Sequence, residues 1–360
     1  MSNRPNAGDG LQPPVFGETD ATSVDSASDI MNHETQPSHK RPLVDAHAHV
    51  FCWGENPRDG FFSQRTQRAW LTRLMLRLTR IHKEKGATLS EKFRSRLLRD
   101  VDQSKLDFVV VLAQDCVYGD DGSRDDSATP FYVSNDYVLD LAGRSNKILP
   151  GCSINPIRRD ALAELERVFE AGCRLVKIHT AIQGVDPALA RFDGFYRRAA
   201  ELGMVLMFHT GYEHSCRVRS QEFADPTRLA RPLDHGGTVI AAHCGTCAFF
   251  DPESQYPGFV RMMRRHDNLY GDTAIMASLI RWRSLWRLGR EETNITARIL
   301  HGSDYPFPPA RLPFLLRTGL FPPQRGNGLD MDLWIKQSFG FGAGYACKLL
   351  DLMGHNSPGA

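Results

Sequence analysis

The chain has 360 residues, of which 41% are hydrophobic and 24% charged, and its formal net charge is +2. This length fits one large barrel or two ordinary domains with a sizeable core. Because no long run carries one sign of charge and no apolar stretch approaches about 18 residues, we expect neither a nucleic acid nor a membrane as partner.

Residues 1–40 are rich in Ser, Asp, Asn, Pro and Gly, and their few apolar side chains bury too little surface to offset the entropy of folding. We therefore expect a disordered tail ahead of a single domain over residues 41–360. The N-terminus lacks the apolar segment of a signal peptide, which predicts a cytoplasmic protein. The eight thinly spread cysteines are expected to be reduced thiols.

From Leu43 onward, short apolar runs alternate with longer amphipathic segments, clearest as helices at 160–171 and 193–202. An insertion rich in Arg and aromatic residues, 54–86, follows the first run and should lie over the barrel mouth, and 329–353 should form helix and loop. Eight strands separated by helices predict an α/β fold, the (β/α)8 TIM barrel. The predicted strands span residues 43–50, 106–113, 147–154, 174–180, 204–210, 238–244, 268–274 and 298–304.

Two histidines, His47 and His49, close the first predicted strand. Because side chains alternate along a strand, their imidazoles should point to the same face. Two neutral imidazoles on one face form half of a site for a divalent metal such as zinc, which takes three or four N or O ligands. The remaining ligands should come from other parts of the chain.

Polar side chains also stand at the ends of other predicted strands. A single histidine at a strand end is commonly structural, but every strand of such a barrel ends at the same mouth, where catalytic groups collect. Joint placement on five strands therefore predicts one shared site. The candidates are His47 and His49 on the first strand, Lys177 and His179 on the fourth, His209 on the fifth, His243 on the sixth and Asp304 on the eighth.

Five motifs carry these residues: Val44-Asp45-Ala46-His47-Ala48-His49, Leu175-Val176-Lys177-Ile178-His179, Phe208-His209-Thr210-Gly211, Ala242-His243-Cys244-Gly245 and Gly302-Ser303-Asp304-Tyr305-Pro306. Together they resemble the amidohydrolase superfamily, in particular its amidohydrolase-2 branch of metal-dependent hydrolases and related decarboxylases. The resemblance covers residues 43–308. One departure is Gly344-Tyr345-Ala346, which stands where the family usually has Gly-Asn-Ala and bears on local packing.

The resemblance implies one divalent ion held by four ligands, with zinc expected and manganese, iron or cobalt as alternatives. In some branches a lysine on the fourth strand is carbamylated and bridges two metals, a role open to Lys177, with His179 beside it. We expect a single metal, because the resemblance is closest to a mononuclear branch. The implied ligands are His47, His49, His209 and Asp304.

The catalytic roles follow from general chemistry. A metal such as zinc acidifies water, and Asp304 beside it would take up a proton and return it to the leaving group. His243, which the resemblance places against the substrate, would polarise or hydrogen-bond the oxygen that gains charge. The loop over the site directly follows His209, and its polar side chains are expected to contact substrate, with Arg217 or Arg219 pairing a carboxylate. These residues are Tyr212, Glu213, His214, Arg217 and Arg219.

Two further residues on the motif strands are expected to have supporting roles. Asp45 shares the face of the two histidines one pleat deeper and should be a buried hydrogen-bond acceptor behind the ligands. His301 has the opposite strand parity from Asp304, so it should point toward the helices and be structural.

These features predict a metal-dependent hydrolase of a small organic substrate with an amide, lactone or ester-like bond. The alternative is a nonoxidative decarboxylase, in which an acid protonates carbon on the same barrel. A metal-binding protein without catalysis is disfavoured because the ligands are accompanied by His243, which the metal alone does not need. The oligomeric state is open between a monomer and a homo-oligomer.

Overall fold

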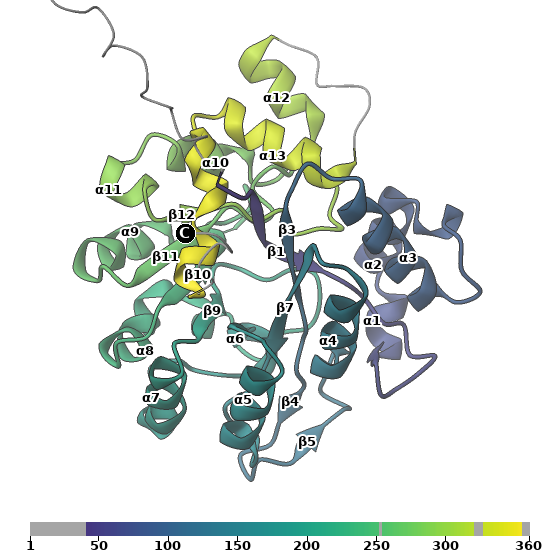
Figure 1. Cartoon of the computed structure of the whole chain (residues 1–360), viewed down its shortest axis with the longest axis vertical. Coiled ribbons are helices and arrows are strands. Elements are labelled where there is room, and N and C mark those ends of the chain that lie inside the picture. The colour runs from purple at the N-terminus through teal and green to yellow at the C-terminus, as the bar shows by residue number, and fades with distance from the viewer. Residues whose placement is uncertain (1–40, 252–253, 320–326, 355–360) are drawn as a thin grey trace, which may run out of the picture. The chain divides into compact units, whose positions relative to one another are not determined.

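A computed structural model describes residues 41–251, 254–319 and 327–354 of the chain, so the tail predicted for residues 1–40 lies outside the described part. Eight parallel strands form the central sheet in chain order, and Figure 1 shows helices around them. Each predicted strand is present, which confirms the expected (β/α)8 architecture. The strands are β1 (Val44–His49), β3 (Phe108–Leu112), β7 (Ile148–Ser153), β8 (Leu175–Ile178), β9 (Val205–His209), β10 (Val239–Ala242), β11 (Leu269–Asp272) and β12 (Ile299–Leu300).

The chain segment after β12 closes the sheet against β1. The amide of Ala46 donates to the His301 carbonyl at 2.8 Å, and the amide of Asp304 donates to the His47 carbonyl at 2.8 Å. A parallel bridge between Ala48 and Tyr305 continues this contact. The first and eighth strand ends are thus joined directly where the motif residues lie.

The helices follow the strands as βα units, and α5 and α7 confirm the two helices that the sequence predicted most clearly. Helix α3 begins with a capping box, in which the side chain of Thr88 and that of Glu91 accept each other's backbone N–H. The longer helices are α2 (Trp70–Thr79), α3 (Leu89–Asp102), α4 (Asn135–Arg144), α5 (Ala161–Glu170), α7 (Asp193–Glu201), α9 (Tyr256–Arg265), α10 (Trp282–Leu288), α12 (Arg311–Thr318) and α13 (Gly328–Ser338). The shorter ones are α1 (Gln64–Arg68), α6 (Thr180–Gln183), α8 (Ala230–Asp234), α11 (Thr293–Thr296) and α14 (Leu349–Leu352).

Two apolar clusters divide the strand residues into an inner and an outer face. On β9, Val205 and Met207 belong to the cluster inside the barrel, while Leu206 and Phe208 pack in the larger cluster that includes the helices. Because the strand alternates, His209 continues the inner face. The same alternation places the side chain of Lys177, two residues after Leu175 on β8, toward the interior.

The insertion after β1 contains a short strand, β2 (Gly60–Phe62), followed by α1 and α2. Strand β2 pairs antiparallel with β6 (Phe131–Val133), and β4 (Val117–Tyr118) pairs with β5 (Arg124–Asp125). A separate aromatic cluster anchors the insertion to α3, and its member Phe51 stacks parallel to the ring of His49 at 6.2 Å. Among the described helices, none is both long and apolar enough to cross a membrane.

Candidate metal centre

His47, His49 and Asp304 bring three metal-ligating atoms together at the joined ends of the first and eighth strands. His47 Nε2 lies 3.1 Å from His49 Nε2 and 3.5 Å from Asp304 Oδ1, and His49 Nε2 lies 3.2 Å from the same oxygen. A tetrahedral ion with ligands at about 2.1 Å spaces its donor atoms about 3.4 Å apart. The spacing and chemistry of this triad therefore fit one divalent ion.

A glycine allows the ends of the first and eighth strands to approach closely at this site, and two residues of the site have positive φ angles. Gly302 faces the first strand, and a Cβ there would lie 2.9 Å from the Cβ of His47. Asp304 has a φ of 62° and His243 a φ of 65°, both in the left-handed region that non-glycine residues seldom adopt. Such strain is retained where the surrounding structure holds it, commonly at functional sites.

Asp272, the last residue of β11, orients two of the predicted site residues and was not identified from the sequence. Its Oδ2 lies 2.7 Å from His47 Nδ1, and its Oδ1 accepts the backbone N–H of His243 at 2.8 Å. The contact assigns the His47 proton to Nδ1 and leaves Nε2 free to ligate. The rule that polar residues at strand ends face the mouth would have found it, because Asp272 ends the seventh strand.

A second group of ligating atoms consists of His179, His209 and Glu213. His179 Nε2 lies 3.1 Å from Glu213 Oε2, and His209 Nε2 lies 3.8 Å from the same oxygen. The structure thus gathers His209 with these two residues rather than with the first triad. Its predicted role as the fourth ligand of that triad stays a prediction.

Lys177 lies beside the first triad, and His243 lies near both His47 and His209. Lys177 Nζ is 3.4 Å from His47 Nε2, and the His243 ring is centred 5.0 Å from that of His47 and 4.8 Å from that of His209. Burial lowers the pKa of Lys177 to about 8 against the opposing effect of nearby carboxylates. Its amine is therefore easier to deprotonate than that of an exposed lysine.

His243 Nδ1 lies 3.2 Å from the carbonyl of Ala274, and burial lowers the pKa of His243 to about 4. A neutral ring that donates Nδ1–H to this carbonyl has only a lone pair on Nε2. His243 therefore offers an acceptor to the site, whereas the sequence led us to expect a donor to a substrate oxygen.

Burial raises the pKa of the Asp304 carboxyl, but the hydrogen bond with His49 and the charges of neighbouring histidines outweigh it and lower that pKa below its usual range. The pKa of Glu213 is likewise raised by burial but lowered further by His179. The site thus presents two carboxylates as proton acceptors.

The residues predicted to support the site are found where expected. Asp45 is fully buried, and its Oδ1 accepts backbone N–H groups of His47 at 3.0 Å and Ser303 at 2.9 Å. Burial raises the pKa of Asp45 to about 6. His301 points outward, and its Nδ1 bonds the hydroxyl of Tyr345 at 2.7 Å, so the tyrosine that departs from the family pattern has a structural partner.

Arg281, which follows β11, is a buried residue that sequence reasoning missed. Its guanidinium donates to the carbonyls of Tyr212 at 2.7 Å and Thr246 at 3.1 Å, so it joins three loops of the mouth. It has no ion-pair partner within 4.0 Å in the described part of the chain. Arg217 and Arg219 are exposed on the loop after β9, and their predicted substrate contacts stay predictions.

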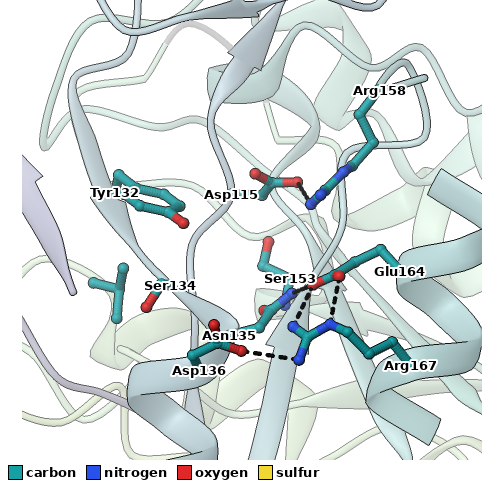
Figure 2. Close-up of a pocket in the computed structure, with 10 residues that line it drawn as sticks. Asp115, Tyr132, Ser134, Asn135, Asp136, Ser153, Arg158, Glu164 and Arg167 are labelled. Carbon is teal, nitrogen blue, oxygen red and sulfur yellow. Dashed lines mark hydrogen bonds and ion pairs between the residues drawn. The ribbon is translucent and has the colours of Figure 1, made fainter. Parts of the chain in front are cut away.

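A pocket of about 310 Å³ lies apart from the two metal-ligating groups, between β6, α4 and α5. Figure 2 shows that its charged side chains face one another: Arg158 pairs with Asp115 at 3.3 Å, and Arg167 pairs with Glu164 at 2.8 Å and Asp136 at 2.9 Å. These charges are therefore already paired: Arg167 links α5 to α4 through Asp136, and Arg158 links the segment after β7 to Asp115 after β3.

The family model described as Amidohydrolase matches residues 44–315. The chain belongs to the amidohydrolase family. Solved structures that share the fold of this amidohydrolase include an uncharacterized TIM-barrel protein from Bordetella bronchiseptica, with a TM-score of 0.57, 16% identity and coverage of 87% of this chain and 99% of that chain. No curated protein matches the amidohydrolase chain.

Two further structures that resemble this amidohydrolase carry different activities in their names. A protein from Pseudomonas putida, provisionally assigned as a 2-pyrone-4,6-dicarboxylic acid hydrolase, has a TM-score of 0.50 and 15% identity, covering 88% of this chain and 98% of that one. A 2,6-dihydroxybenzoate decarboxylase from Rhizobium has a TM-score of 0.52 and 12% identity, covering 87% and 99%. At these identities the matches establish the shared barrel fold.

Proposed function

We propose that the chain is a metal-dependent hydrolase that cleaves an amide, lactone or ester-like bond of a small organic substrate. The observation that carries the proposal is the triad of His47, His49 and Asp304, whose ligating atoms lie 3.1–3.5 Å apart in a chain of the amidohydrolase family. A divalent ion held by this triad would act as a Lewis acid and lower the pKa of water. Zinc is the expected ion, with manganese, iron or cobalt as alternatives.

The chain's own groups supply the proton transfers. Asp304 is held as a carboxylate beside the ring nitrogens of both histidines and can accept a proton from water, then return it to the leaving group. His243 adds a second acceptor through Nε2, because Nδ1 faces the Ala274 carbonyl. Asp272 bonds the ring of His47 and the backbone N–H of His243, and it thereby fixes the positions of these two residues relative to each other.

Hydrolysis is favoured over decarboxylation because Asp304 of the triad and the Nε2 atom of His243 both accept protons. Decarboxylation requires an acid that delivers a proton to carbon, whereas hydrolysis requires removal of a proton from water. The fold alone does not distinguish hydrolysis from decarboxylation, since the similar structures include proteins named for each activity.

A substrate screen of the metal-reconstituted protein tests this function, with hydrolysis products and carbon dioxide measured in parallel. We expect turnover of an amide, lactone or ester without carbon dioxide, and loss of both metal and turnover in a His47→Ala, His49→Ala double variant. Carbon dioxide release from a 2-hydroxyaryl or unsaturated acid would replace the proposal by a decarboxylase. Unchanged metal content in the double variant would exclude the triad as the ligand set.

A further inference from the structure

Helix α2, in the insertion after β1, carries apolar side chains on two faces. Met75 and Leu76 pack against the aromatic cluster that anchors the insertion. Trp70, Leu74 and Leu78 recur at intervals of four residues, so they line up along another face of the helix. These three residues are 74%, 38% and 58% exposed. The protein itself covers the first face, whereas the second remains open to solvent.

Arginines surround this exposed apolar stripe. Arg73 and Arg77 lie three and seven residues after Trp70, so they share the face of the stripe. Residues 64–83 contain six Lys and Arg residues and no Asp or Glu. Five arginines of this segment are exposed, and among the described residues none of them has an ion-pair partner within 4.0 Å. They are Arg65, Arg68, Arg73, Arg77 and Arg80.

The combination of charge and apolar surface determines what can cover this face. A second copy of the same face would bring unpaired arginines against one another, which is unfavourable. A nucleic acid would pair with the arginines but leave the leucines in water. An anionic lipid surface satisfies both kinds of side chain, because its headgroups attract arginine and its acyl boundary accepts leucine and tryptophan.

We propose that the exposed face of α2 docks the protein on an anionic lipid surface, with Trp70, Leu74 and Leu78 at the level of the headgroups. The contact is peripheral, since α2 has ten residues and a spanning helix needs about 20. It goes beyond the proposed hydrolase activity and does not depend on it. The expectation of no membrane partner came from the charge pattern of the whole chain and from spanning length, and neither describes a surface helix.

Flotation of the full-length protein with lipid vesicles tests the proposal without an activity assay. We expect the protein to float with phosphatidylcholine vesicles that contain about 30% phosphatidylglycerol, and to remain unbound with pure phosphatidylcholine or at high salt. Trp70 gives a direct signal of contact, because brominated lipid quenches an indole at the level of the headgroups. Trp70→Phe should still float but lose that quenching.

Two double variants separate the contribution of charge from that of apolar contact. Arg73→Gln, Arg77→Gln should weaken partitioning into anionic vesicles by about 30-fold, since each basic residue near such a surface contributes about fivefold. Leu74→Ser, Leu78→Ser should weaken partitioning by at least about 10-fold, because two leucines lose their apolar contact with lipid.

Matched controls make the same changes elsewhere on the surface. Arg197→Gln, Arg261→Gln removes two exposed arginines from α7 and α9, so it lowers the net charge equally. Leu162→Ser removes a leucine on α5 that is 48% exposed. Both controls should bind anionic vesicles as tightly as the wild type.

The outcomes that contradict the proposal are distinct from one another. Absence of wild-type binding to anionic vesicles at low salt would overturn it, as would unchanged binding in both folded double variants of α2. An equal loss in Arg197→Gln, Arg261→Gln would reduce the effect to net charge. A dimer that Leu74→Ser, Leu78→Ser dissociates, without vesicle binding, would assign the face to a second copy. Binding of an RNA oligonucleotide without vesicle binding would assign it to a nucleic acid.

Discussion

Replacement of Asp272 by Asn should weaken metal binding at the first triad without removing a ligand. The side-chain carbonyl of the introduced asparagine can still accept the backbone N–H groups of His243 and Ala274, which now bond Oδ1 of Asp272 at 2.8 and 3.1 Å. The side-chain amide would face His47 Nδ1 as a donor. The ring then has to carry its proton on Nε2, the atom that faces His49 and the triad.

The magnitude follows from the contact that is lost. Asp272 is fully buried, and its 2.7 Å bond to His47 is charge-assisted, a class worth about 1.5–3 kcal/mol. Replacing such partners of ligating histidines commonly lowers metal affinity about 10–100-fold, equal to about 1.4–2.7 kcal/mol. The free energy of the lost hydrogen bond agrees with that of the expected loss in metal affinity, so we expect the dissociation constant of the metal to rise about 10–100-fold.

Competition with a chromophoric chelator measures the affinity, and circular dichroism confirms folding. Asp45→Asn is the matched control, because Asp45 is equally buried but its Oδ1 accepts backbone N–H groups of His47 and Ser303 rather than a proton from a ligating ring. It should retain an affinity close to that of the wild type. An unchanged affinity in Asp272→Asn, or an equal loss in both variants, would refute the argument from the proton position.

His243→Ala should retain metal and lose about 100-fold in turnover, because a positioned proton acceptor commonly contributes that much; metal loss comparable to a ligand variant would make His243 a ligand instead. Tyr345→Phe should cost about 2 kcal/mol, because it removes the buried hydroxyl that bonds His301 and Thr273. Thermal unfolding should show a melting temperature lower by roughly 3 °C with unchanged metal content, and a loss of metal would contradict an outward-facing His301. Deletion of residues 1–40 should leave metal content, melting temperature and turnover nearly unchanged, because their composition offers little apolar surface; a large drop in any of them would contradict this.

The barrel was predictable because its strands are buried on both faces and therefore appear as apolar runs. The eighth strand shows the limit of this pattern. Its apolar run predicted residues 298–304, but only Ile299–Leu300 pairs as a strand, because the chain then turns to meet β1 through backbone contacts of His301 and Asp304. The pairing of β2 with β6 also escaped prediction, since three-residue strands from distant segments leave no period in the sequence.

The site was predictable where local spacing determines orientation. His47 and His49 are two residues apart on one strand, so their convergence followed from strand geometry. Asp304 lies beyond the end of β12 with a positive φ, so its exact placement depends on the turn that joins it to β1. The sequence indicated Glu213 only as a substrate contact in the loop over the site, because its approach to His179 and His209 depends on the path of that loop, which spacing does not determine. The proton on His243 depends on the carbonyl of Ala274, which reaches it across from another strand end.

Arg281 connects three loops at the rim of the barrel mouth. It lies in the loop after β11 and holds the carbonyls of Tyr212 and Thr246, which belong to the loops after β9 and β10. A graft that replaces one of these loops to redirect substrate preference would leave a buried guanidinium without its acceptor, at a cost of a few kcal/mol. Exchange of specificity between relatives on this barrel therefore requires that the three loops be transferred as a set.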